Sequence, residues 1–207
     1  MVKPGLRDVP VWDLPVRFGH WLLVSSFVVA WLSADGEEWR LIHVGAGTLM
    51  AAIVLFRVLW GFVGSRHARF ADFVAGPKAA WAYLAGLIRR TPHHHTGHNP
   101  AGGYAILLIL GLVLLVCASG LAAYNDIGGD LVEKGHDVLA DLLLAVIGIH
   151  LAGVVVGSLA HRENLVRAMV TGRKRGPEED AIANRHGPVA AGLLIWAALA
   201  VWLSRFL

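Results

Sequence analysis

The sequence predicts an all-α integral membrane protein with five transmembrane helices, and two observations support this prediction. Apolar residues make up 56% of the 207 residues and charged residues only 16%, a composition unusual for a soluble fold. The charged residues gather in short connecting stretches and leave apolar blocks of about 17 to 25 residues, the length of a membrane-spanning helix. The net charge of +3 is small, and its distribution gives no patch for phosphates, so we expect no nucleic acid as a partner.

The five expected spans share their length, their apolar composition and the absence of the two-residue alternation that is typical of strands. They cover residues 16–33, 41–63, 103–124, 136–160 and 189–203. Helices are favoured because a backbone in hydrocarbon must satisfy its own hydrogen bonds. The first block could also be read as a signal peptide, but acidic residues precede it. Between the second and third spans, residues 77–90 are expected to form a helix in the headgroup layer.

The lysines and arginines alternate from loop to loop and predict the orientation. Fifteen of the 18 lie before or at the start of the first span, at the end of the second span or after it, or between the fourth and fifth. The other three, Arg40, Lys134 and Arg205, fall on the opposite side. Because cytoplasmic loops carry the excess of basic residues, we expect a cytoplasmic N-terminus and an extracytoplasmic C-terminus.

Four of the eleven histidines lie within or at the ends of spans, where ionisable residues are functional candidates. His136 and His150 are fourteen residues apart on one helix, so they face the same way and differ in depth by about 21 Å. The topology places His43 level with His136 near the outer face. It places His20 level with His150 near the inner face. We therefore expect two pairs of imidazoles on facing helices.

Paired imidazoles indicate a cofactor, because helix bundles hold cofactors between facing side chains and imidazole is a common axial ligand of haem iron. The expected fold is a four-helix transmembrane di-haem bundle with a fifth, C-terminal transmembrane helix. The expected ligand pairs are His20–His150 at the inner site and His43–His136 at the outer site. Two protein ligands on each iron leave no open position for substrate, which favours electron transfer. Structural histidines or a transition-metal site are the alternatives.

Other residues have secondary roles in this hypothesis. Arg57 follows His43 by fourteen residues and Arg17 precedes His20 by one turn, so each could neutralise a haem propionate or lie at the interface as an ordinary arginine. Small residues could leave room for the macrocycle or serve ordinary helix packing. They are Gly45, Gly47, Gly111, Gly120, Gly148 and Gly153.

A histidine-rich loop supports a competing function. His93, His94, His95 and His98 lie on the predicted cytoplasmic side, and such tracts bind divalent metals. A divalent-metal transporter is therefore the alternative from another class of protein. The segment around His98 can equally be a turn before the third span.

Four segments of the chain resemble one known family. They are Trp12-Asp13-Leu14-Pro15-Val16-Arg17-Phe18-Gly19-His20-Trp21, Ile42-His43-Val44-Gly45, Gly97-His98-Asn99-Pro100-Ala101-Gly102-Gly103, and the fourth span with His136 and His150. The family is prokaryotic cytochrome b561, which includes the b-type cytochrome subunits of nickel-iron hydrogenases. The resemblance implies a membrane domain of four spans over residues 1–175, followed by a linker and a C-terminal transmembrane helix over residues 176–207.

The resemblance also implies cofactors and partners. We expect two non-covalent b haems in a multi-pass protein of the bacterial inner membrane, surrounded by lipid. Electrons would pass between ubiquinone or menaquinone and an extracytoplasmic redox protein such as a c-type cytochrome. Within the same fold, a superoxide:quinone oxidoreductase or a hydrogenase cytochrome b subunit are alternatives. The sequence leaves open whether this electron-transfer component is an enzyme in its own right, and whether it forms a homodimer.

Overall fold

The computed structural model describes residues 6–91 and 93–206, and it confirms the all-α membrane fold. Five helices of the described chain are long and apolar enough to cross a membrane. They are α1 (Leu14–Leu32), α2 (Arg40–Val63), α5 (Pro100–Tyr124), α6 (Gly129–His161) and α8 (Gly187–Leu203). Helix α6 starts seven residues before the expected span, so His136 lies about two turns inside the helix. Lys3, one of the expected inner cations, lies outside the described residues.

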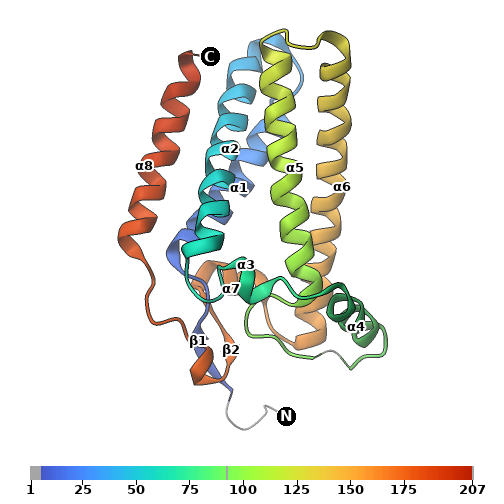
Figure 1. Ribbon diagram of the computed structural model, residues 1–207, viewed down its shortest axis with the longest axis vertical. Coiled ribbons are helices and arrows are strands. Elements are labelled where there is room, and N and C mark those ends of the chain that lie inside the picture. The colour runs from blue at the N-terminus through green and yellow to red at the C-terminus, as the bar shows by residue number, and fades with distance from the viewer. Residues whose placement is uncertain (1–5, 92, 207) are drawn as a thin grey trace.

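Four of these helices form the expected bundle, and the fifth lies outside it. Helix α1 packs on α2, α5 packs on α6, and α2 packs on α5. The core between them is apolar and includes Val54, Val113 and Leu143. Helix α8 packs on α2 and α1, on the side away from α5 and α6 (Figure 1). Its Trp196 indole donates a hydrogen bond of 2.9 Å to the Ala52 carbonyl of α2.

A polar cap closes one end of the bundle. It contains α3 (Phe70–Phe73), α4 (Pro77–Ile88), α7 (Leu165–Thr171) and an antiparallel sheet of β1 (Arg7–Pro10) and β2 (Arg173–Gly176). The sequence predicted helix α4 but not the sheet. The strands occur in charged segments outside the apolar blocks, where strand pairing is not excluded by lipid.

The cap brings the three basic segments of the chain to the same end, as the alternating topology requires. The α1–α2 and α5–α6 connections and the end of α8 lie at the opposite end (Figure 1). We call the capped end the inner end and the opposite end the outer end, following the predicted orientation. The compartment that each end faces stays a prediction.

Candidate haem sites

The start of α1 is fixed by a buried carboxylate. Asp13 is fully buried, and one of its oxygens accepts a hydrogen bond of 2.8 Å from the Val16 amide, which caps the helix. Its other oxygen accepts a bond of 2.9 Å from the Trp60 indole of α2. The carbonyl of Gly172, a residue at φ +78°, accepts a hydrogen bond of 3.0 Å from the Trp12 amide. These contacts set the depth of α1, and with it the depth of His20.

The outer pair is the better defined of the two expected histidine pairs. The ring centres of His43 in α2 and His136 in α6 lie 6.1 Å apart, and the rings are nearly perpendicular at 83°. Two metal–nitrogen bonds of about 2 Å each, plus about 1 Å from each nitrogen to its ring centre, predict a spacing of roughly 6 Å. The observed spacing matches this value, and it is equally the spacing of two rings in a T-shaped contact.

Hydrogen bonds orient both outer imidazoles. The Nδ1 atom of His43 lies 2.8 Å from the Ala30 carbonyl of α1, and Nδ1 of His136 lies 3.0 Å from the Val116 carbonyl of α5. Ser119 Oγ is a further neighbour of His136 Nδ1 at 3.3 Å. Because a carbonyl only accepts, we assign the proton of each ring to Nδ1. The Nε2 lone pairs are then available for a metal, as in other metal-binding histidines.

Gly120 makes room for the His136 ring. A Cβ at this position of α5 would lie 2.8 Å from Cε1 and 3.1 Å from Nδ1 of His136. The sequence suggested that Gly120 accommodates a macrocycle, whereas the structure shows that it accommodates the imidazole. By contrast, an added Cβ at Gly47 or Gly111 would have no atom within 4 Å.

The inner pair is less closely joined. His20 of α1 and His150 of α6 are near enough for their charges to interact, and the His20 ring lies 5.2 Å from that of Trp21. In the described part of the chain, no hydrogen bond or ring contact connects the two histidines. The Arg17 guanidinium donates to the Val170 carbonyl, while its Nε is buried without a partner. Arg17 therefore has a structural contact in addition to its candidate role.

Arg57 and His98 are two further polar groups buried at the inner end. Nη1 of Arg57 has no hydrogen-bond partner among the described residues, and its guanidinium lies 5.4 Å from the centre of the Phe70 ring. Nδ1 of His98 is also buried without a partner, and its ring lies 4.4 Å from Trp12 and 4.8 Å from Phe73. Burial, reinforced by the Arg57 charge, holds the pKa of His98 well below 6.5, so the ring is neutral at pH 7.

Sequence reasoning placed His98 in a turn and missed its burial. The sequence feature that could have indicated this burial is the position of His98 directly before Asn99, which caps α5. The donors present fit haem in both sites. The outer site offers two free imidazole nitrogens, and the inner site adds buried donors that lack an acceptor, as a propionate would require.

His94 and His95 of the histidine-rich loop make contacts within the cap. His94 Nε2 is 3.8 Å from a Glu163 oxygen, and its ring is 5.7 Å from His161, which is hydrogen-bonded to Tyr83 at 3.1 Å. Within residues 6–91 and 93–206, no group of three or more His, Cys, Asp or Glu side chains could hold a metal ion. The metal-transporter alternative gains no support from the described residues.

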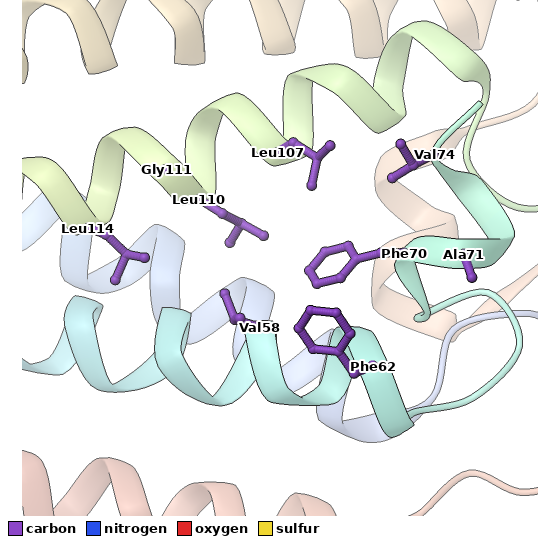
Figure 2. Close-up of a pocket in the computed structure, with 9 residues that line it drawn as sticks. All are labelled: Val58, Phe62, Phe70, Ala71, Val74, Leu107, Leu110, Gly111 and Leu114. Atoms are coloured by element: carbon purple, nitrogen blue, oxygen red, sulfur yellow. The ribbon is translucent and has the colours of Figure 1, made fainter. Parts of the chain in front are cut away.

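An apolar groove opens on the flank of the bundle. It has a volume of about 600 Å³ and lies between α2, α3 and α5 (Figure 2). Val58 and Phe62 of α2 face Leu107 and Gly111 of α5, and residues 70, 71 and 74 line the inner end. The Phe70 ring also lies 5.4 Å from the Arg57 guanidinium, so one wall of the groove contacts Arg57.

The chain is similar to proteins whose names describe b-type cytochrome subunits. The relatives named probable Ni/Fe-hydrogenase B-type cytochrome subunit include the following three. That of Rhizobium leguminosarum bv. viciae is 25% identical over 81% of this chain and 89% of its own length. That of Azotobacter vinelandii is 26% identical over 79% and 87%, and that of Azotobacter chroococcum mcd 1 is 30% identical over 57% and 60%. No solved structure matches the chain.

The matched region contains all four candidate ligand histidines. The sequence model described as prokaryotic cytochrome b561 matches residues 11–172, which covers the bundle and ends before β2 and α8. The chain therefore belongs to the prokaryotic cytochrome b561 family, whose members are b-type membrane cytochromes that carry electrons through haem b.

Proposed function

We propose that this protein holds two b haems and conducts electrons across the membrane between the quinone pool and an extracytoplasmic redox partner. The observation that supports this most strongly is the pairing of His43 and His136, 6.1 Å apart with both Nδ1 atoms bonded to carbonyls. Haem b, when bound, supplies a one-electron redox centre.

Each ligand histidine has a defined task in this proposal. His43 and His136 would hold the outer iron from α2 and α6, and His20 and His150 would hold the inner iron from α1 and α6. Iron held by two histidines would serve electron transfer and not chemistry on a bound substrate. The rise of α6 separates its two ligands by about 21 Å, which places one site near each face.

Two arginines near the inner site are candidates for binding haem propionates. Arg57 has a buried nitrogen without an acceptor, and the same is true of Nε in Arg17. A buried guanidinium requires an anion, because an unpaired charge in a low-dielectric interior is strongly unfavourable. Of the two, Arg57 is the stronger candidate, since Arg17 already bonds the Val170 carbonyl.

The groove of Figure 2 supports ubiquinone or menaquinone as the membrane substrate. An isoprenoid chain needs an apolar channel open to lipid, and the groove provides one with a volume of about 600 Å³. Its inner end, at Phe70, adjoins Arg57 and therefore the inner haem site. In this arrangement, the groove would hold quinone beside the inner site, where a bound haem would supply or accept its electrons.

The partner at the outer end is proposed from the relatives. Their names describe subunits of Ni/Fe hydrogenases, so a hydrogenase-type redox enzyme is the first candidate. The outer loops are acidic, which would equally suit a basic c-type cytochrome. Acidic residues there include Asp35, Glu37, Glu38, Asp126, Asp130 and Glu133. This assignment assumes the predicted orientation in the bacterial inner membrane.

Haem content and its dependence on single histidines test the proposal. The purified protein should contain about two haem b per chain by the pyridine haemochrome assay. His136→Ala should remove one haem and His20→Ala the other, because each variant deletes one axial ligand. His95→Ala, outside both pairs, is the control and should keep both. A colourless wild-type protein, or loss of both haems in the control, would contradict the proposal.

The partner is tested separately by reduction kinetics. Oxidised protein in detergent or nanodiscs is mixed with a quinol, with reduced cytochrome c, or with a nickel-iron hydrogenase under hydrogen. We expect rapid reduction by quinol and by the hydrogenase. If only cytochrome c exchanges electrons, the hydrogenase assignment is wrong.

A further inference from the structure

Two buried donors at the inner end lack acceptors and flank the same aromatic ring. The ring of His98 lies 4.8 Å from Phe73, and the Arg57 guanidinium lies 5.9 Å from Phe73 on α3. Nδ1 of His98 and Nη1 of Arg57 are both buried without hydrogen-bond partners among the described residues. Native proteins rarely leave buried polar groups unpaired, so a missing partner for these groups is expected.

The position of His98 is built by contacts on both sides of it. Before it, the buried Lys174 ammonium of β2 donates to the His95 carbonyl at 3.1 Å and to the Gly97 carbonyl at 3.2 Å. After it, the Asn99 side chain caps α5 by accepting the Gly102 amide at 2.7 Å. His98 therefore lies in a fixed segment and not in a loose loop.

Among the described residues, no acidic side chain has a free oxygen to pair with these two donors. Asp13 is the acidic group whose charge reaches Arg57, but its two oxygens already bond the Val16 amide and the Trp60 indole. A cation and a neutral imidazole with unpaired nitrogens together match a carboxylate, which accepts several hydrogen bonds at once. The expected inner ligand His150 lies in the inner half of α6, toward the same end of the bundle as Arg57 and His98.

We propose that His98 is a positioning residue of the inner haem and donates a hydrogen bond to one of its propionates, which Arg57 neutralises. This inference rests on the proposed function, and it adds a residue from the loop before α5 to the site. The hydrogen bond ties the edge of the macrocycle to the polar cap. It also disperses negative charge near the iron, which favours the reduced state.

His98→Phe removes the hydrogen-bond donor and keeps an aromatic ring between Trp12 and Phe73. His98→Gln loses the ring and keeps an N–H donor. His67→Phe is the matched control, because His67 contacts the same Trp12 ring at 6.3 Å but already bonds the Asp180 carbonyl at 2.7 Å. Haem per chain and the two midpoint potentials are measured by spectroelectrochemistry without quinone.

We expect His98→Phe either to lower one of the two midpoint potentials or to reduce the content to one haem per chain. His98→Gln should stay closer to wild type, and His67→Phe should leave both potentials unchanged. Arg57→Gln should shift the same transition in the same direction, and it replaces His98→Phe if that variant does not assemble.

Three outcomes would overturn the inference. If His98→Phe keeps two haems with unchanged potentials, His98 makes no hydrogen bond to a propionate, and the proposed function still holds. Unchanged potentials with a raised KM for quinol would assign His98 to a quinone headgroup. An equal shift in His67→Phe would show that packing around Trp12, and not the hydrogen bond, sets the potential. Failure of the proposed function itself is distinct, because wild type would then lack haem.

Discussion

Gly120→Ala should weaken the outer haem site without touching a ligand. The added Cβ would lie 2.8 Å from Cε1 and 3.1 Å from Nδ1 of His136, closer than carbon atoms pack. Relief requires the imidazole to move away from α5, which breaks its bond of 3.0 Å to the Val116 carbonyl. Overpacking of this kind costs about 1–3 kcal/mol. At about 1.4 kcal/mol per tenfold change, outer-haem affinity should fall about 5- to 150-fold.

The assay is haem titration of the apoprotein, followed by a redox titration that resolves the two haems. The outer transition should weaken or shift while the inner one stays in place. Gly192→Ala on α8, outside the four-helix bundle, is the control, since its added Cβ has no atom within 4 Å. Equal haem affinity in Gly120→Ala and Gly192→Ala would refute the reasoning that Gly120 positions His136.

Three further predictions concern the groove, the α1 anchor and the polar cap. Gly111→Leu should raise the KM for quinol several-fold, because the side chain would enter the groove. Gly192→Leu on α8, away from the groove, should leave the KM unchanged, and equal KM values in the two variants would exclude the groove as the quinone path. Asp13→Ala should lower stability by about 2–4 kcal/mol, from a lost cap of about 1 kcal/mol and a lost charged hydrogen bond to Trp60. An unchanged melting temperature in detergent would contradict this. Burial raises the pKa of Glu163, but the nearby His94 imidazole, the hydrogen bond from the Arg175 amide and the charge of Lys174 outweigh it, so the pKa lies below 4.5. Its stabilisation is therefore complete above pH 4.5 and lost as the pH falls through the folded-state pKa, and Glu163→Gln should flatten the acid side of the thermal-stability profile.

The spans could be predicted from the sequence because the membrane imposes their length and composition. The boundary of α6 could not, since residues 129–135 read Gly-Asp-Leu-Val-Glu-Lys-Gly and carry no apolar signal. This stretch is helical as an extension of α6 beyond its apolar block. The sheet was missed for a related reason. Its strands are four residues long and charged, and Arg7 pairs with Gly176 at the far end of the chain.

The candidate site was predictable where helix geometry determined it. A separation of fourteen residues on α6, combined with the topology, predicted the pairing of His43 with His136, and the structure places these rings 6.1 Å apart. That they share one iron stays a prediction. His98 could not be found in this way. Its burial depends on Trp12 and Phe73, which approach it only through tertiary packing.

The two candidate sites are organised by different physical means. At the outer site, carbonyls of α1 and α5 orient His43 and His136, so the ligands are prepared by neutral backbone contacts. At the inner site, the described residues give the ligands no such bonds, and the nearby Arg57 and His98 have buried nitrogens without partners in that part of the chain. Each unpaired group costs about 1–3 kcal/mol, so an anionic cofactor would gain a few kcal/mol there by pairing them. The outer haem would then be held mainly through its iron, and the inner haem through both its iron and its propionates. Because positive charge near a haem favours the reduced state, this difference should give the inner haem the higher potential.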